Sequence, residues 1–404
     1  MDAQPGRVER LRRLKSAMAE CDLSALVCVR NLDVLLVSGF CPVIGNAVAI
    51  VTDEPKVFLV VPEEARELAE RGWADRIETY RLGSLDRLED TPRELFALVE
   101  SLLRPLADGL TRIGMEMGPV HLPAAYVSMN VYSAALRAEL EHGFSRAQLA
   151  PADGLLASMR MRPTPWERER IRGACTMAGA AYRKGAAALR PQVPETNAVL
   201  PFRAAYAECA TTHAHVARAD SYFYCMSGSN AALAWAAFQQ SRMTPLAAGV
   251  TVLVHCNAYA DGYWTDLTRT YVLGAPGEEL RRIFDAIARA RDAALAAIRP
   301  GVRACDVDKA ARDVLAAAGY GAAFKHPLGH GVGFTAIDHN EPPRIHPASR
   351  QLLEEDMVFN VEPGVYIDGF GGARDCNVVA VTGDGVELLS PFQQSPQEWC
   401  IPLS

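Results

Sequence analysis

Three of the chain's nine histidines gather in a segment that begins His326-Pro-Leu-Gly-His330-Gly-Val-Gly333 and continues to His339. Glycines on both sides of His330 leave its imidazole on a backbone that other groups can approach closely. An isolated histidine in such a loop is more often a structural residue, but this one is accompanied by His326, His339 and Glu341. Imidazoles and carboxylates bind metal ions and carry protons in hydrolytic sites. The segment therefore predicts a metal site or acid–base chemistry.

A β-hairpin expected at residues 250–271 supplies two more candidate ligands. The segment has the form strand, Ala-Asp-Gly turn, strand. If Ala260 and Asp261 form a two-residue loop, His255 falls directly opposite Asp266, with Cβ atoms about 5 Å apart. We therefore expect these two side chains to share one face of the hairpin, as metal ligands would.

A second hairpin is expected at residues 358–381, where glycines punctuate the turn. A longer loop centred near Gly369 places Glu362 opposite Cys376 by the same counting. We expect both side chains to face one cavity, an expectation that a slip of one residue in the turn would undo.

The first part of the chain reads as an α/β domain that ends near residue 155. Apolar periodicity predicts a helix at 7–19 and strands at 25–29 and 48–61. Further helices are expected at 63–71, 91–106 and 124–140, with a strand at 112–117. Alternation of this kind describes an α/β domain. The second domain then spans residues 156–404.

A helix start marks the entry to the second domain. Thr164 is a capping residue, Pro165 suits the first turn, and Glu167 completes a Thr-x-x-Glu capping box, so a helix is predicted at 165–188. Two more helices, at 275–299 and 306–318, end at glycine signals. Two hairpins, each attended by helices, predict a duplicated α/β unit with a site between its halves.

Composition limits the classes of function and partner. The 404 residues are half apolar, with 48 carboxylates against 41 Lys and Arg and a net charge of −7. This balance argues against nucleic acid or an anionic membrane as a partner. The N-terminus lacks the apolar region of a secretory signal, and no apolar run approaches the ~20 residues of a membrane span, so we expect a cytoplasmic protein. The ten cysteines form no CxxC pair and are expected to be mostly reduced, buried thiols.

Motifs in both parts of the chain resemble the pita-bread superfamily of prolidase, aminopeptidase P, methionine aminopeptidase and creatinase. They are Gly228-Ser-Asn-Ala-Ala-Leu233, Gly262-Tyr-Trp-Thr-Asp-Leu-Thr-Arg-Thr270, Gly329-His-Gly-Val-Gly333, His339-Asn-Glu-Pro-Pro343 and Met357-Val-Phe-Asn-Val-Glu-Pro-Gly-Val-Tyr366. The segments 10–18 and 23–28 are similar to the N-terminal domain of the prolidase and creatinase branch. The resemblance implies a creatinase-like N-terminal α/β domain, residues 1–155, followed by a pita-bread catalytic domain, residues 156–404.

The resemblance also implies a five-ligand site for two divalent ions that activate water for attack on an amide carbonyl. Asp266, His330 and Glu362 match three of these ligands. His255 stands where the family has its first Asp. Cys376 stands where the family has its last Glu, because the run Val-Arg-Ile-Glu-Asp reads Ala-Arg-Asp-Cys-Asn here. Both changes remove negative charge that balances two dications, so a single ion is the first expectation.

Three further residues are carried over as catalytic. His326 and His339 match two active-site histidines, although His339 lies two residues further from His330 than in the common pattern, and Arg374 matches an arginine that supports the ligand hairpin. A third family histidine, seventeen residues before the first ligand, is absent because that position is a phenylalanine. The residues expected to line a substrate pocket are Phe238, Trp235, His215 and Tyr263.

Four functions remain open. The first is cleavage of an amide-type C–N bond in a small amino-acid-derived substrate, with one Zn, Fe or Mn ion on a nitrogen, oxygen and sulfur ligand set. That set is His255, Asp266, His330, Glu362 and Cys376. The others are a metal-independent hydrolase or lyase like creatinase, a single-iron oxidative enzyme, and an inactive binding protein. The cofactor is accordingly one divalent ion or none, and the resemblance implies a homodimer.

Overall fold

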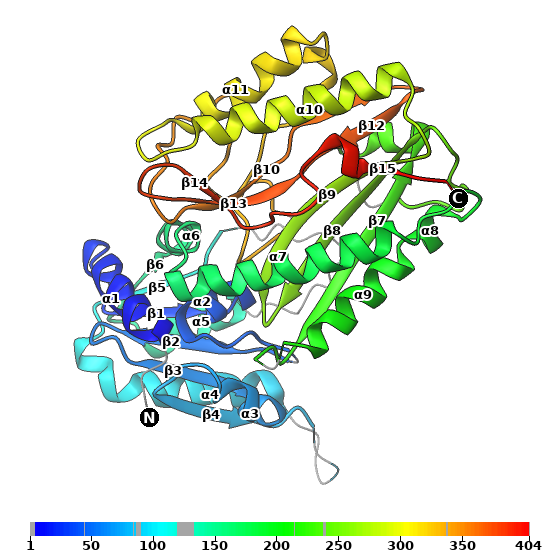
Figure 1. Ribbon diagram of the computed structural model, residues 1–404. Coiled ribbons are helices and arrows are strands. Elements are labelled where there is room, and N and C mark those ends of the chain that lie inside the picture. Colours follow the sequence, from blue (N-terminus) through cyan, green and yellow to red (C-terminus); the bar gives the residue numbers. More distant parts are fainter. Residues whose placement is uncertain are drawn as a thin grey trace. The chain divides into compact units, whose positions relative to one another are not determined.

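The computed structural model describes residues 5–43, 45–83, 85, 90–118, 133–213, 215–236, 240–336 and 338–403. The chain divides into two compact units, residues 1–160 and 161–404 (Figure 1). Each unit has its own sheets and its own hydrophobic core. All ten cysteines are free thiols. Within the described ranges, no helix is long and apolar enough to cross a membrane.

The first unit is built on a mixed sheet of six strands in the order β4-β3-β2-β1-β5-β6. The strands are β1 (Ala25–Cys28), β2 (Val48–Thr52), β3 (Val57–Pro62), β4 (Arg76–Tyr80), β5 (Arg112–Met115) and β6 (Gln148–Pro151). The helices are α1 (Pro5–Glu20), α2 (Asn31–Ser38), α3 (Arg66–Ala69), α4 (Thr91–Leu103), α5 (Ser133–Gly143) and α6 (Asp153–Met161). Strands β1 to β3 pair antiparallel, whereas β4, β5 and β6 join in parallel.

Most elements predicted for this unit are present, but β4, β6 and α6 were not predicted, and three further regions differ. The apolar run 48–61 is a hairpin of β2 and β3, because Asp53-Glu54-Pro55 supplies turn residues within it. Helix α2 was not predicted, since six of its eight residues are buried and it shows no polar stripe. Part of the helix predicted at 124–140 lies outside the described residues, and α5 begins at Ser133.

The second unit contains three sheets, with strand orders β15-β9-β8-β7, β10-β13-β14 and β11-β12. The strands are β7 (Ala219–Ser227), β8 (Thr251–Ala260), β9 (Tyr263–Leu273), β10 (Val358–Val361), β11 (Gly364–Ile367), β12 (Gly371–Arg374), β13 (Asn377–Val381), β14 (Val386–Leu388) and β15 (Cys400–Ile401). The helices are α7 (Pro165–Ala186), α8 (Glu195–Ala198), α9 (Leu200–Thr211), α10 (Glu278–Ala297) and α11 (Ala304–Ala317). The predicted capping box of Thr164 and Glu167 starts α7, whereas β7 and α9 were not predicted.

Helices α7 and α9 run along β7, β8 and β9 (Figure 1). Tyr182 of α7 is fully buried there, with its hydroxyl 2.9 and 3.0 Å from the main-chain oxygens of Val254 and Leu267. Its ring packs against Phe202 and Phe223. Because side chains alternate along a strand, the candidate ligands of β8 and β9 point away from this helix-covered face.

The loop between β8 and β9 is one residue later than predicted. Ala260 lies opposite Tyr263, so Asp261 and Gly262 form the two-residue loop. Both loop residues have positive φ, 50° and 87°. A type I′ turn requires this conformation, and Asp-Gly favours it.

The shifted loop changes the partners of the candidate ligands. His255 lies opposite Thr268, and Asp266 lies opposite Asn257, so the predicted direct pairing of His255 with Asp266 is wrong. The two residues are nevertheless diagonal neighbours on one face. The Nδ1 atom of His255 lies 3.8 Å from the Oδ1 atom of Asp266.

The register predicted for the second hairpin is confirmed. Strands β11 and β12 pair with Ile367 opposite Gly371, so Gly369, with a φ of 77°, is the centre of the loop. The pair β10 and β13 continues the same register beyond a break. Glu362 and Cys376 lie in that break, at opposing positions between the two ladders.

Candidate active site

His330 is held in place by close backbone contacts that only glycine permits. A Cβ atom on Gly329 would lie 1.9 Å from the main-chain oxygen of Asn360, and one on Gly331 would lie 2.1 Å from that of Pro342. The close approach expected from the flanking glycines is therefore present. Asn360 also accepts a hydrogen bond from the His330 amide, at 2.7 Å. These contacts fix the His330 loop against strand β10.

The imidazole of His330 lies close to two carboxylates. Its Nδ1–H donates to the main-chain oxygen of Gly331 at 3.1 Å, so Nε2 carries the lone pair and accepts from the Asn360 amide at 3.2 Å. Nε2 lies 3.6 Å from Asp266 Oδ2 and 3.9 Å from Glu362 Oε1. Burial lowers the pKa of His330 to about 3, so this ring is neutral. His330, Asp266 and Glu362 are hereafter called the trio.

The two carboxylates of the trio are buried close to one another. Burial raises the pKa of Glu362 to about 7. Burial, and then the neighbouring charge of Glu362, raises the pKa of Asp266 well above its ordinary range. Two buried acids with raised pKa values are a typical feature of sites that bind a cation or exchange protons.

His255 is committed to hydrogen bonds at both ring nitrogens. Its Nδ1 lies 3.1 Å from Nη2 of Arg374 and 3.1 Å from the Thr268 hydroxyl. Because a guanidinium only donates, Nδ1 is the acceptor, and Nε2–H donates to Asn257 Oδ1 at 2.8 Å. Burial, and then the charge of Arg374, lowers the pKa of His255 well below its ordinary value. His255 is therefore a neutral partner of Arg374.

Cys376 contacts Asp266, and its thiol is protonated. Its Sγ lies 3.2 Å from the main-chain oxygen of Asp266 and 3.9 Å from Asp266 Oδ1. Burial raises the pKa of this thiol well above its ordinary value. A thiol that donates to a carbonyl does not offer the thiolate that metal ions bind.

The two histidines carried over as catalytic have different surroundings. Nδ1–H of His326 donates to the main-chain oxygen of Pro327 at 2.8 Å, and its Nε2 accepts from the Tyr366 hydroxyl at 2.9 Å. Burial lowers the pKa of His326 to about 3. His339 is exposed, and its ring centroid lies 4.8 Å from that of His330.

The predicted pocket residues are dispersed. Tyr263 is buried between Trp166 of α7 and Phe334, on the face of β9 opposite to Asp266. His215 is exposed in the turn after α9. Trp235 is 39% exposed, with Lys325 Nζ 5.9 Å from its ring centroid. Phe238 lies outside the described residues.

Four buried residues of the site were missed by the sequence analysis. They are Asn257, Thr268, Asn360 and Tyr366, and each is within hydrogen-bonding distance of a candidate residue. Asn257 and Asn360 each lie two residues from a candidate ligand in a predicted strand. The two-residue period of a strand places them on the same face as that ligand and was the available signal.

The candidate ligands differ in how well their atoms suit a metal ion. Two ligands of a common ion, each about 2.1 Å away, lie roughly 3 to 3.5 Å apart. The trio is a few tenths of an ångström wider, and in the described part of the chain no group of three or more His, Cys, Asp or Glu side chains is placed to hold a metal ion at these distances. The two acids of the trio and Nε2 of His330, which accepts from the Asn360 side-chain amide, carry the lone pairs that a metal ion binds. Both ring nitrogens of His255 form hydrogen bonds, one of them with the Arg374 guanidinium, and the protonated thiol of Cys376 donates to a main-chain oxygen, so these two side chains are less suitable ligands.

Comparison with known proteins agrees with this arrangement of segments. Residues 169–383 match metallopeptidase family M24, and residues 10–162 match the creatinase/prolidase N-terminal domain. An Xaa-Pro dipeptidase of Pyrococcus horikoshii is 25% identical over 386 residues, which cover 96% of this chain and 98% of that protein. An Xaa-Pro dipeptidase of Lactobacillus helveticus is 41% identical over 141 residues, 34% of this chain and 37% of that protein.

Solved structures show the same fold over the whole length. The prolidase of Pyrococcus horikoshii has a TM-score of 0.74 at 24% identity and covers 95% of this chain and 99% of its own. An Xaa-Pro dipeptidase from Bacillus anthracis has a TM-score of 0.77 at 22% identity, and the match covers 98% of this chain and 100% of that protein. These matches confirm the expected fold, a creatinase-like α/β domain followed by a pita-bread domain.

The matched family covers more than half of the chain and includes the described candidate residues of β8, β9 and the second hairpin. The prediction of an enzyme of the metallopeptidase and creatinase superfamily is thereby confirmed, and membership implies divalent metal cofactors. The chain belongs to metallopeptidase family M24, with a creatinase/prolidase N-terminal domain before its catalytic domain.

Proposed function

We propose that this chain hydrolyses the amide C–N bond of a small amino-acid-derived substrate at a site with one divalent ion. The observation that supports this most directly is the trio, in which the His330 lone pair lies within 4 Å of both Asp266 and Glu362. These three residues would hold the ion. Bound there, a divalent ion polarises a carbonyl and lowers the pKa of water. Xaa-Pro dipeptides are the first substrates to test, because the relatives are named for them.

The residues around the trio differ in whether they can move protons. The Tyr366 hydroxyl donates to Nε2 of His326 at 2.9 Å, and because burial raises the pKa of Tyr366 and lowers that of His326, this pair stays neutral and orients both rings. His339 is exposed beside His330 and can exchange protons with solvent. Arg374 keeps a buried positive charge 3.8 Å from Glu362, which favours the ionised form of that acid.

A test of this function compares turnover in matched variants. Product formation from Xaa-Pro dipeptides and from N-acyl amino acids is followed by mass spectrometry, with and without added Zn²⁺ or Mn²⁺. His330→Ala and Glu362→Gln should each lower kcat/KM at least 100-fold. His346→Ala, a histidine outside the trio that caps a nearby turn, should change it less than threefold. Unchanged turnover in His330→Ala would refute the proposal.

A metal-independent reaction is the second candidate. It is favoured by the commitment of His255 and Cys376 to hydrogen bonds, which leaves acids and histidines as the active groups. Dialysis against a chelator distinguishes the two. Turnover that survives with no bound ion supports acid–base catalysis, whereas turnover that returns only with added metal supports the single-ion proposal.

We further propose that the protein is cytoplasmic, as the sequence analysis expects, and that it is a homodimer, as the resemblance to the two-domain branch implies. Light scattering during size-exclusion chromatography should give twice the chain mass of 43.8 kDa. A monomer mass at micromolar concentration would contradict this part of the proposal.

A further inference from the structure

A short segment between β12 and β13 carries two site residues without belonging to either strand pair. Asp375 and Cys376 lie between the end of β12 at Arg374 and the start of β13 at Asn377. Arg374 and Cys376 contact His255 and Asp266, whereas Asp375 faces a different set of partners. The ladder does not hold this segment continuously, and its backbone amides form only single hydrogen bonds, from Asp375 to Pro363 at 3.2 Å and from Cys376 to Thr268 at 3.1 Å.

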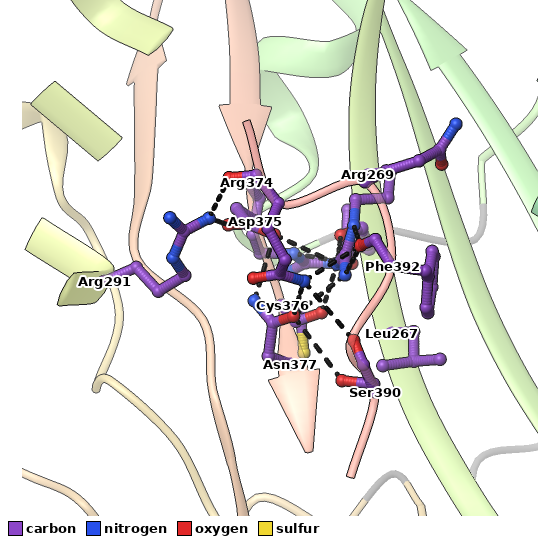
Figure 2. A network of polar contacts seen from close by, with 12 residues as sticks. Leu267, Arg269, Arg291, Arg374, Asp375, Cys376, Asn377, Ser390 and Phe392 are labelled. Carbon is purple, nitrogen blue, oxygen red and sulfur yellow. Dashed lines mark hydrogen bonds and ion pairs between the residues drawn. The ribbon is translucent and has the colours of Figure 1, made fainter. Parts of the chain in front are cut away.

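Asp375 is clamped between two buried arginines (Figure 2). Its Oδ1 lies 3.0 Å from Arg269 Nη1, and its Oδ2 lies 2.8 Å from Arg291 Nη1. The side-chain amide of Asn377 donates to Asp375 Oδ1 at 3.0 Å. The side chains of Asp375, Arg269 and Arg291 are 1%, 0% and 7% exposed. The Arg291 contact is a charge-assisted hydrogen bond, which is strong and directional, and the Arg269 contact is a close buried ion pair.

Arg269 extends the clamp to the backbone of the site. Its Nη1 donates to the main-chain oxygens of Thr268 at 2.8 Å and Cys376 at 2.7 Å. The same guanidinium therefore joins β9, which carries Asp266, to the segment that carries Cys376 (Figure 2). Arg291 adds a third element, because it belongs to α10.

The clamp lies on the reverse side of the segment from the trio. With Asp375 fixed to Arg269 and Arg291, the residues on either side of it in sequence are turned toward Asp266 and Glu362. Loss of the carboxylate would leave two buried guanidiniums without their shared anion, and buried charges that lose a partner are costly. The segment would then be released, with Cys376 and Arg374.

We propose that Asp375 is a positioning residue, which acts through Arg269 and Arg291 to hold Arg374 and Cys376 against the two acids of the trio. The effect on turnover rests on the proposed function. The effect on the mobility of the segment does not, so the test below uses readouts of both kinds.

The first readout is the rate at which iodoacetamide alkylates Cys376 in the metal-free full-length protein, measured by peptide mass spectrometry. Cys175 and Cys256, both fully buried in the same unit, serve as internal references. Asp375→Asn should accelerate alkylation of Cys376 at least tenfold, about 1.4 kcal/mol of local opening. The reference thiols should change less than threefold, and Asp375→Glu should restore most of the protection.

Because the substitution also removes a charge near the thiol, amide hydrogen exchange in residues 371–381 is measured beside it. The Cys376 amide donates to the Thr268 oxygen at 3.1 Å, so its exchange should accelerate with alkylation. The matched control is Arg168→Gln, which breaks a 2.9 Å ion pair with Asp356 in the same unit. This control should leave both Cys376 readouts unchanged.

Turnover completes the test. Asp375→Asn should lower kcat at least tenfold with KM changed less than threefold, because it displaces groups beside the trio. Equal acceleration at all three cysteines, or no acceleration at Cys376, would overturn the positioning role. If Asp375→Asn does not fold, Arg291→Gln is used instead, because it removes one of the two arginine contacts of Asp375. It should accelerate alkylation of Cys376 about threefold and leave the two reference thiols unchanged. If neither the wild type nor any variant turns over the tested substrates, the result counts against the proposed function but not against the positioning role.

Discussion

The backbone of Gly329 lies so close to Asn360 that no side chain fits between them. A Cβ atom on Gly329 would lie 1.9 Å from the main-chain oxygen of Asn360, about 1.5 Å short of the 3.4 Å where ordinary contact begins. A main-chain oxygen cannot rotate away, so Gly329→Ala must separate the His330 loop from β10. Overpacking costs about 1 to 3 kcal/mol, and a backbone clash puts this case at the upper end. Asn360 also holds the His330 ring, so the site moves as well.

Urea unfolding followed by circular dichroism measures the loss of stability. Gly329→Ala should lower the free energy of unfolding by about 3 kcal/mol and weaken Mn²⁺ binding at least tenfold. Gly173→Ala is the matched control, because its Cβ meets nothing within 4 Å in helix α7 and alanine favours helix interiors by up to about 1 kcal/mol. A free energy of unfolding for Gly329→Ala within about 0.5 kcal/mol of the wild-type value would refute the described contact.

Three further changes test the packing and electrostatics by the same unfolding assay. Thr164→Ala removes the cap of helix α7 and should cost about 1 kcal/mol, and no change would show that Glu167 alone sustains the cap. Tyr182→Phe deletes a fully buried donor and should also cost about 1 kcal/mol, whereas a gain in stability would contradict its hydrogen bond. Burial raises the pKa of Glu116 to about 8 from 4.5, so the folded protein keeps a proton that the unfolded chain releases between these values. Stability should therefore fall as pH rises from about 4.5 to about 8, and Glu116→Gln should flatten that fall; equal slopes would exclude Glu116 as its source.

The fold was predictable where turn and capping signals were strong. The capping box before α7 and the loop centred on Gly369 are both present as expected. The first loop was misplaced by one residue although the sequence held the better signal, since Asp261-Gly262 suits a turn with two positive φ values. Helix α2 could not be recognised by periodicity, because it is buried on nearly every side.

The sequence predicted which residues form the candidate site better than it predicted the hydrogen bonds between them. His330, Asp266 and Glu362 lie together as the motifs implied. The partnership of His255 with Arg374 joins residues 119 apart in sequence and depends on the orientation of a guanidinium, which no local pattern encodes. The clamp of Asp375 likewise depends on an arginine from α10.

The number of metal ions bound per chain tests the central claim most directly. The protein is stripped with a chelator, dialysed against excess Zn²⁺ or Mn²⁺, freed of unbound metal and measured by plasma mass spectrometry. The account predicts one equivalent in the wild type, none in His330→Ala, and a second equivalent in the double variant His255→Asp/Cys376→Glu, which introduces the two carboxylates that the resemblance implies. Two equivalents in the wild type, or none, would contradict the single-ion site.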